Sequence, residues 1–186
     1  IQVILSDSPR SHCSSACNNF NCVRATVIVN AASGVRAREV DAECALMAAA
    51  LEQRGVRATV RQVKGERLTE AAREAAAEGA EAVVMAGGDG TMSAGAAALA
   101  GGDVPMGILP LGTLNHFARD LGIPTELEAA LAVVASGIVK RVDVGEANGR
   151  VFVNNASIGL YPHAVAAREK EQEEKGTAKW LAMCRA

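Results

Sequence analysis

Short apolar runs alternate with segments of helical period over most of the chain. Ala25–Asn30 and Ala82–Ala86 are nearly continuous runs of apolar and β-branched residues, which is typical of buried strands. Over Asp41–Arg54 the apolar residues recur at i, i+3, i+4 and i+7, which predicts an amphipathic helix that ends at Gly55. The same pattern predicts strands at 25–30, 56–63, 82–86 and 106–109, and helices at 41–54, 68–78, 91–100, 115–121 and 127–136.

The order of these elements predicts the fold. Strands that are apolar throughout and alternate with helices are typical of a parallel sheet covered on both faces. We therefore predict a doubly wound α/β domain with a mostly parallel sheet over residues 24–137. Beyond it, two strand-like runs at 138–147 and 150–157 are joined by Asn148-Gly149, which favours a two-residue hairpin turn. One hairpin and a charged segment cannot bury a core, so we expect residues 138–186 to begin a β-rich second domain that is incomplete.

Residues 1–23 lack the alternation of the remaining chain. They show no helical period, no initiating Met and no basic start followed by a long apolar run, as a cleavable signal would have. We predict a disordered or non-native extension. The segment contains His12, Cys13, Cys17 and Cys22, but no paired C-x-x-C knuckle, so we predict no zinc site and assign no metal ligands.

Length and charge exclude several classes of protein. The 186 residues suffice for one ordinary domain, or for one domain and part of another. With 19 Lys and Arg against 21 Asp and Glu, the formal net charge is −2, so we expect no nucleic-acid partner. No stretch approaches the roughly 18 consecutive apolar residues of a spanning helix, so we expect no transmembrane segment.

The segment Gly87-Gly-Asp-Gly-Thr91 follows the third predicted strand and opens a helix. Ligands of open α/β sheets bind beyond the carboxyl ends of the strands, and glycines there let the backbone approach an anion. Thr91 is placed to cap the helix, whose free N–H groups favour a phosphate. Asp89, as an exposed loop carboxylate, would repel a phosphate unless it shares a metal ion with it or instead holds a ribose hydroxyl or a proton. The alternative is a tight Gly-Asp-Gly turn without a ligand.

Two more polar loops follow strands at the same end of the predicted sheet. In Leu109–Asn115, Gly112 allows close approach, while Thr113 and Asn115 offer a hydroxyl and an amide. Asn30–Gly34 is a turn of small residues after the first predicted strand. Three such loops at one edge predict a shared site, and a nucleotide fits it.

Three motifs occur in order along the chain: Asn30-x-x-Ser-Gly34, Gly87-Gly-Asp-Gly-Thr91 and Pro110-Leu-Gly-Thr-Leu-Asn-His-Phe-Ala-Arg119. Together they resemble the catalytic domain of diacylglycerol kinases and of the related bacterial lipid kinases and sphingosine kinases. The resemblance covers roughly Ala25–Leu160, including Phe152–Gly159. NAD kinases share the Gly-Gly-Asp-Gly-Thr loop but lack the third motif, so the resemblance favours a lipid kinase.

The resemblance implies a lipid kinase that transfers the γ-phosphoryl of ATP to a lipid hydroxyl, with Mg²⁺ as a second cofactor. It implies the nucleotide-binding fold shared with NAD kinases, and Asp89 as the catalytic candidate. It also implies a cytoplasmic enzyme that meets its lipid at the inner surface of a membrane. The nucleotide-binding candidates are Asn30, Ala31, Ala32, Ser33, Gly34, Gly87, Gly88, Asp89, Gly90, Thr91, Gly112, Thr113 and Asn115.

The chain departs from the family pattern at several positions. It has Ser93-Ala94 where the family often has Asn-Glu, His116 where Asp is frequent, and Val63 at the strand end where the family uses Thr near the adenosine. In the resembling enzymes a β-rich second domain supplies structural metal ligands and the acidic base, and none of these residues can be assigned within Ile138–Ala186. Two alternatives stay open, a non-catalytic nucleotide-binding module and an NAD kinase-like enzyme. The incomplete hairpin also leads us to expect self-association.

Overall fold

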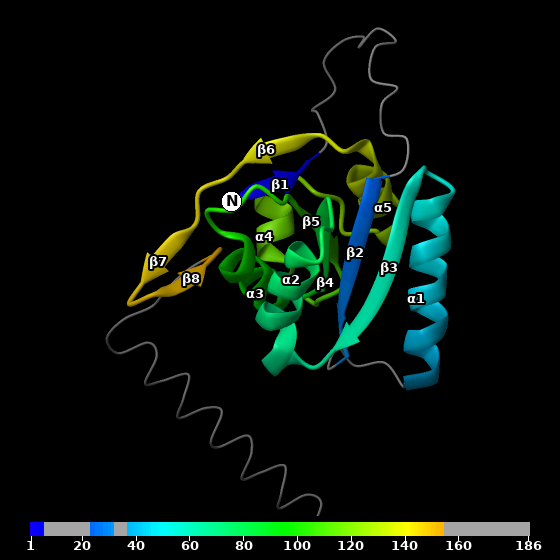
Figure 1. Ribbon diagram of the computed structural model, residues 1–186, viewed down its shortest axis with the longest axis horizontal. Helices are drawn as coiled ribbons and strands as arrows, with labels where there is room; N and C mark the ends of the chain where they lie inside the picture. Colours follow the sequence, from blue (N-terminus) through cyan, green and yellow to red (C-terminus); the bar gives the residue numbers. More distant parts are fainter. Residues whose placement is uncertain (6–22, 32–36, 155–186) are drawn as a thin grey trace, which may run out of the picture. The chain divides into compact units, whose positions relative to one another are not determined.

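The computed structural model describes residues 1–5, 23–31 and 37–154, all within one compact unit that spans Ile1–Asn154. The other residues, drawn in grey in Figure 1, lie outside the described part of the chain. The predictions for 6–22, for Ala32, Ser33 and Gly34, and for 155–186 therefore fall outside it as well.

A six-stranded sheet forms the centre of this unit (Figure 1), with strand order β3-β2-β4-β5-β1-β6. Neighbouring strands run parallel from β3 to β1, and only β6 runs antiparallel to its neighbour. The predicted mostly parallel sheet is therefore confirmed. The strands are β1 (Gln2–Ile4), β2 (Val23–Asn30), β3 (Val56–Val63), β4 (Ala82–Gly87), β5 (Met106–Pro110) and β6 (Val139–Arg141).

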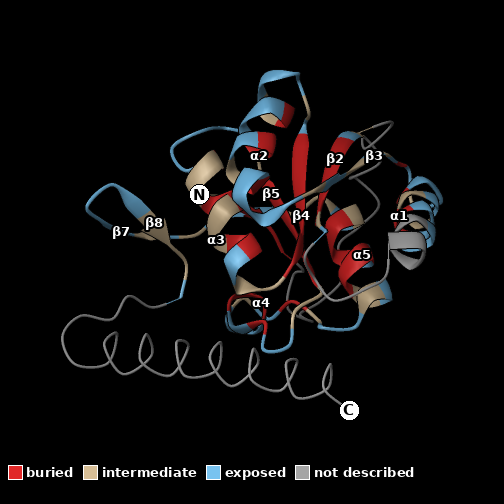
Figure 2. Ribbon diagram, turned by 90° about the horizontal axis from the view of Figure 1, so that it is seen from below, coloured by how far each residue is buried: buried red, intermediate tan, exposed pale blue. Residues whose placement is uncertain are grey.

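Helices cover both faces of the sheet, as the doubly wound prediction requires. Figure 2 shows α2 and α3 on one face, and α1 and α5 on the other. A short 3₁₀ turn, η1, leads directly into α2, and α4 is a single short helix after β5. Their bounds are α1 (Ala37–Glu52), η1 (Gly65–Arg67), α2 (Leu68–Ala77), α3 (Asp89–Leu99), α4 (His116–Asp120) and α5 (Leu127–Ser136).

The packing of α3 on the sheet fixes where its first turn lies. Strands β4 and β5 are buried along their whole length, because helices cover both of their faces. Gly95 brings α3 close to them: a Cβ at this position would lie 2.5 Å from Cγ of Met85 and 2.9 Å from Sδ of Met106. The small residue lets the helix approach the sheet closely, and α3 starts two residues after the end of β4.

Residues 1–5 are ordered within the sheet, so the disorder that we considered for residues 1–23 is wrong for this segment. Gln2–Ile4 form β1 inside the sheet, and Val3, Ile4 and Leu5 are buried. Three residues are too few to show a period, and their partner strands are far away in the sequence. Local pattern therefore could not identify this strand.

The antiparallel hairpin is confirmed, but the predicted boundary before it is too early. Strands β7 (Gly145–Ala147) and β8 (Arg150–Phe152) pair across Asn148 and Gly149, whose φ angles are 51° and 74°. The preceding strand β6, however, pairs with β1 in the main sheet. The main sheet thus extends past residue 137, where we expected the first domain to end.

Candidate functional site

Three strand ends bring the predicted loops together at one edge of the sheet. The register pairs Val29 of β2 with Ala86 of β4, and Gly87 of β4 with Pro110 of β5. The loops that follow these strands therefore start at the same level. The amide of Leu111 donates to the carbonyl of Gly87 over 3.0 Å, which ties the second loop to the first. The predicted convergence of the three loops is confirmed for their described residues.

We expected Thr91 to cap the helix, but the structure shows that it connects two loops instead. Helix α3 begins two residues earlier, at Asp89, with Gly88 at the N-cap. The Thr91 side chain is buried and its Oγ1 accepts a 3.3 Å hydrogen bond from Nδ2 of Asn30. The amides of Thr91 and Met92 donate to the carbonyl of Gly88, so the donors that the start of α3 offers at the shared edge are the amides of Asp89 and Gly90.

The four glycines around this edge differ in whether a larger side chain would fit at their positions. A Cβ on Gly87 would collide with the Thr91 side chain, and one on Gly112 would lie 2.5 Å from Cα of Gly88. A Cβ on Gly88 would make only an ordinary 3.4 Å contact, and nothing lies within 4 Å of one on Gly90. Packing therefore requires Gly87 and Gly112, whereas Gly88 and Gly90 leave room on the surface of the first turn of α3.

Asn115 builds the second loop from within. It is buried and adopts the left-handed conformation, with φ 51° and ψ 46°. Its Oδ1 accepts from the amide of Gly112 at 2.9 Å, and its Nδ2 donates to the carbonyls of Gly112 at 2.8 Å and Pro110 at 3.3 Å. The amide that we expected to face a ligand is thus engaged inside its own loop. The side chain of Thr113 is exposed at the same edge.

Asp89 is neither an exposed loop residue nor an isolated carboxylate. It is half-buried in the first turn of α3, and its two oxygens accept the amides of His116 at 3.1 Å and Phe117 at 3.0 Å. These amides are the first of α4, so the carboxylate of one loop holds the start of the helix that follows the other. The two glycine-bearing loops are therefore joined by a charged side chain as well as by the backbone.

The environment of Asp89 favours its charged form. Burial alone would raise the pKa of this carboxyl, but hydrogen bonds from Phe117 N–H, from the Asn154 side chain and from His116 N–H lower the pKa below its ordinary value. A proton acceptor works best with a pKa near the operating pH. The arrangement thus fits a carboxylate that positions the two loops better than one that collects a proton.

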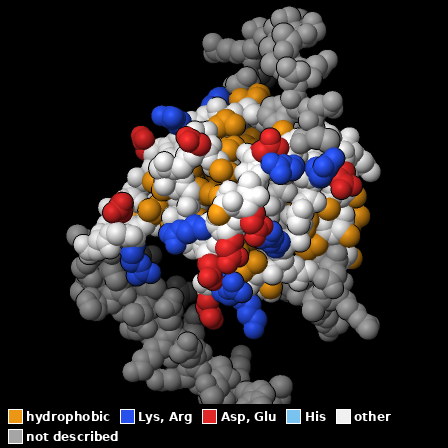
Figure 3. Space-filling model, viewed as in Figure 1, with side chains coloured by type: hydrophobic (Ala, Val, Ile, Leu, Met, Phe, Trp, Pro, Cys, Tyr) orange, Lys and Arg blue, Asp and Glu red, His pale blue; other side chains and the backbone are white. Residues whose placement is uncertain are grey.

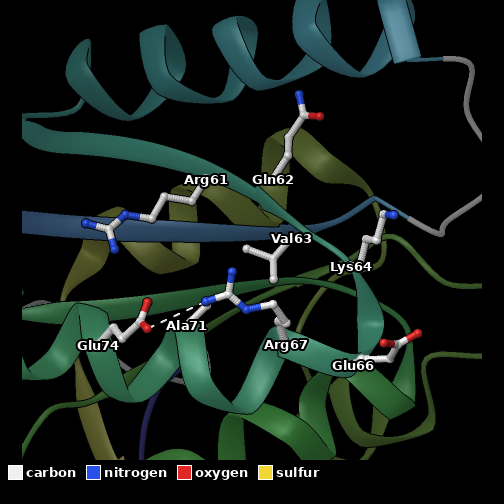
Figure 4. Close-up of a pocket in the computed structure, with 8 residues that line it drawn as sticks. All are labelled: Arg61, Gln62, Val63, Lys64, Glu66, Arg67, Ala71 and Glu74. Carbon is white, nitrogen blue, oxygen red and sulfur yellow. Dashed lines mark ion pairs between the residues drawn. The ribbon is translucent and has the colours of Figure 1, made fainter.

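A cavity of about 440 Å³ lies beside the first loop, between the end of β3 and α2 (Figure 4). Val63 faces this cavity, and its carbonyl accepts the amide of Ala31 at 2.9 Å. Arg67 reaches into it and pairs with Glu70 at 3.0 Å and Glu74 at 3.7 Å, while Figure 3 shows acidic and basic side chains intermingled over α2. Of the residues that line this cavity, the sequence pattern indicated only Val63, because charges spaced along a helix are typical of a solvated face.

Comparisons with known proteins show which family the chain is similar to. The family described as the diacylglycerol kinase catalytic domain matches residues 24–147. A lipid kinase YegS-like protein of Pseudomonas aeruginosa is 40% identical over 147 residues, which cover 77% of this chain and 47% of that protein. A diacylglycerol kinase of Bacillus subtilis is 43% identical over 95 residues, covering 49% of this chain and 31% of the relative.

A crystal structure of a diacylglycerol kinase from Bacillus anthracis is similar in fold. It superposes with a TM-score of 0.58 at 27% identity, over 71% of this chain and 50% of the other. The chain therefore spans about half the length of this protein, and half or less of the curated relatives it matches.

Proposed function

Because the chain belongs to the diacylglycerol kinase catalytic domain family, we propose that the protein transfers the γ-phosphoryl of ATP to the hydroxyl of a lipid at a membrane surface. The observation that carries this proposal is the open first turn of α3. Gly90 is exposed there with free space around it, at the edge where three loops meet. Backbone N–H donors without side chains in front of them are what a phosphate group requires.

Each part of the edge has a role in holding the nucleotide under this proposal. The phosphates bind the amides at the start of α3, next to Gly88 and Gly90. The hydrogen bond between Asn30 and Thr91 keeps the first loop against this turn. The exposed hydroxyl of Thr113 faces the same edge, and the adenosine extends toward Val63 and its cavity.

We assign Mg²⁺ to the phosphates of the nucleotide and not to a site built by the described residues. Mg²⁺ binds through carboxylates together with substrate phosphates. Asp89 is the carboxylate at this edge, and both of its oxygens already accept amide N–H groups. Among the residues that the structure describes, no group of three or more His, Cys, Asp or Glu side chains could hold a metal ion. The described residues therefore do not form a complete Mg²⁺ cage by themselves, and the phosphates of the nucleotide would supply most of the ligands of the ion.

Positioning and charge neutralisation dominate phosphoryl transfer, and the described residues suit that task. Asp89 keeps the loops after β4 and β5 in a fixed arrangement around the phosphates. Its low pKa makes it a weak proton acceptor, so we propose that a group outside the described residues takes the proton of the lipid hydroxyl. Asp89 is then a positioning residue of the site.

We propose that the protein meets its lipid in the cytoplasm, as a peripheral protein at the inner membrane surface. In the described part of the chain, no helix is long and apolar enough to span a bilayer. The lipid would have to be reached from the surface, which is compatible with an open edge on the sheet.

We also propose that the 186-residue chain associates with itself through the hairpin β7–β8. Among the described residues its two strands form a separate two-stranded sheet, and Val151 and Phe152 are only half-buried. Light scattering should therefore give a mass above 19.2 kDa. A monodisperse monomer at that mass would contradict the proposal.

A transfer assay separates the lipid kinase from its two alternatives. A chain continued to the length of the matched relatives is incubated with γ-labelled ATP and Mg²⁺, and either with vesicles that contain diacylglycerol or with NAD. Label in the lipid supports our proposal, whereas label in NAD supports an NAD kinase-like enzyme. Binding of ATP without label in either acceptor would support the other alternative, a non-catalytic nucleotide-binding module.

The same assay can compare the 186-residue chain with a longer chain. We expect weak or no lipid labelling by the 186 residues alone, because half of the relatives' length has no counterpart here. A chain continued to the length of those relatives should label the lipid. Full activity of the short, monomeric chain would mean that the proton acceptor lies within it, with Asp89 as the first candidate.

A further inference from the structure

One strand of the main sheet comes from outside the family domain. The family match covers residues 24–147, which include β3, β4, β5, β6 and nearly all of β2. The remaining strand, β1, is not added at an edge but lies between β5 and β6. Within the matched segment alone, the sheet therefore has a gap that is one strand wide.

The backbone of β1 fills this gap and pairs with the strands on both sides of it. On one side Val3 pairs with Met106 of β5 in parallel. On the other side the residues of β1 pair with β6 in antiparallel fashion, and the ladder continues beyond both ends. The amide of Leu5 donates to the carbonyl of Ile138 at 2.8 Å, and the amide of Val142 donates to the carbonyl of Ile1 at 2.8 Å.

Consecutive side chains of this segment are buried, one on each face of the sheet. Val3 is 0% exposed and Ile4 4% exposed, although successive strand residues point to opposite faces of a sheet. Helix α5 packs on this part of the sheet, and a further cavity of about 220 Å³ is lined by Ile4, Val134 and Val139 among others. The gap therefore accepts a short extended segment that is apolar at consecutive positions.

We propose that the gap between β5 and β6 is a strand-acceptor site, and that its occupant is the extended apolar segment Ile1–Leu5. An empty gap would leave the inner edge of β5 without hydrogen-bond partners and expose apolar surface, both of which are unfavourable. Binding of an extended peptide to a free strand edge supplies main-chain hydrogen bonds, while pockets for alternate side chains give specificity. The site goes beyond the proposed kinase activity, since it does not depend on a nucleotide.

Occupation of the gap also supports the candidate nucleotide site. Strand β5 ends at Pro110 and leads into the loop that Asn115 closes. An occupant that pairs with β5 holds the strand on which this loop is mounted. The acceptor site thus connects a segment outside the family domain to the edge where we place the phosphates.

Peptide binding to a variant of the 186-residue chain tests the proposal. Val3→Asp combined with Ile4→Asp should expel β1, because two carboxylates cannot be buried there without partners. A fluorescent peptide of sequence Ile1–Ser6 should then bind the variant saturably in anisotropy measurements. The unaltered chain should bind the peptide at least about 100-fold more weakly, because its own tethered segment competes at high effective concentration. The same peptide with both aspartates should not bind.

Two outcomes would overturn the acceptor site. One is a folded variant that does not bind the peptide, and the other is equal binding to the variant and the unaltered chain. If the variant is unfolded by circular dichroism, excess peptide should restore the folded spectrum. Failure to restore it would also contradict the proposal.

A cysteine pair tests the register without disturbing the core. The hydrogen-bonded levels at Leu5 and Ile138 and at Ile1 and Val142 make Gln2 and Arg141 a non-hydrogen-bonded pair, whose side chains lie closest. Gln2→Cys with Arg141→Cys should therefore form a disulfide that mass spectrometry detects. The control Gln2→Cys with Lys140→Cys places the second thiol on the opposite face and should not. Equal linkage in both variants, or none in the first, would overturn the placement of the occupant.

Discussion

The loops after β4 and β5 both contain glycines at the same edge of the sheet, yet their glycines differ in purpose. In the loop after β5, Gly112 lies against Gly88. Its amide donates to Oδ1 of Asn115, and this hydrogen bond closes the loop. After β4, the surface around Gly90 in the first turn of α3 stays open. One loop thus serves as a support and the other as the binding surface that it supports. A glycine-rich motif can therefore combine residues needed for packing with residues left free for a ligand.

The largest effect is expected from bulk in the supporting loop. Gly112→Val should destabilise the protein by about 3 kcal/mol, because its Cβ would press on the backbone of Gly88, which cannot move aside like a side chain. Urea unfolding followed by circular dichroism measures this loss, and ATP binding should disappear with it. Gly102→Val serves as control, since Gly102 is exposed after α3 and its Cβ would have ordinary contacts. Equal stability of the two variants would show that the loops do not pack as described.

Removal of the Asn115 side chain should cost slightly less. Asn115→Ala loses its hydrogen bonds within the loop and places alanine in the left-handed region, for about 2–3 kcal/mol in total. Asn115→Gly should recover about 1 kcal/mol of this, because glycine adopts that conformation without strain. Thermal unfolding of both variants separates the two contributions. A glycine variant as stable as the parent would mean that the side-chain hydrogen bonds contribute nothing.

Loss of the charge that joins the two loops should have a moderate effect with a defined pH dependence. Asp89→Asn should cost about 1–2 kcal/mol at pH 7, because an amide can accept only one of the two N–H groups and lacks the charge at the start of α4. The folded-state pKa of Asp89 is lowered, so its contribution is complete above the ordinary Asp value of about 3.9 and is lost as the pH falls through the lower folded value.

Unfolding free energies of the parent and Asp89→Asn at pH 7, 5 and 3 measure this dependence. The difference between the two proteins should be constant from pH 7 to pH 5 and shrink toward pH 3. A difference that stays constant or grows on acidification would refute the role of the charge. Loss of phosphoryl transfer without any loss of stability would instead support direct contact of Asp89 with the nucleotide.

The fold and the convergence of the loops were predictable from the sequence because they depend on local signals. The apolar runs of β2 and β4 and the glycines that follow them identify strands and their carboxyl ends without knowledge of distant partners. The roles of single residues were less accessible. Nothing near Asp89 in the sequence indicates that its partners are the amides of His116 and Phe117, and Val3 gives no local sign that Met106 lies beside it. Such pairings arise only when the sheet assembles.

Gly90→Ala tests the central claim that the first turn of α3 binds phosphate. Alanine in an exposed helix should raise the free energy of unfolding by up to about 1 kcal/mol. Its methyl group should nevertheless weaken ATP binding in calorimetric titration about 10-fold or more, by displacing at least one charge-assisted hydrogen bond. The control Gly102→Ala should leave ATP binding unchanged. A Gly90→Ala protein that binds ATP as tightly as the parent would contradict the phosphate site.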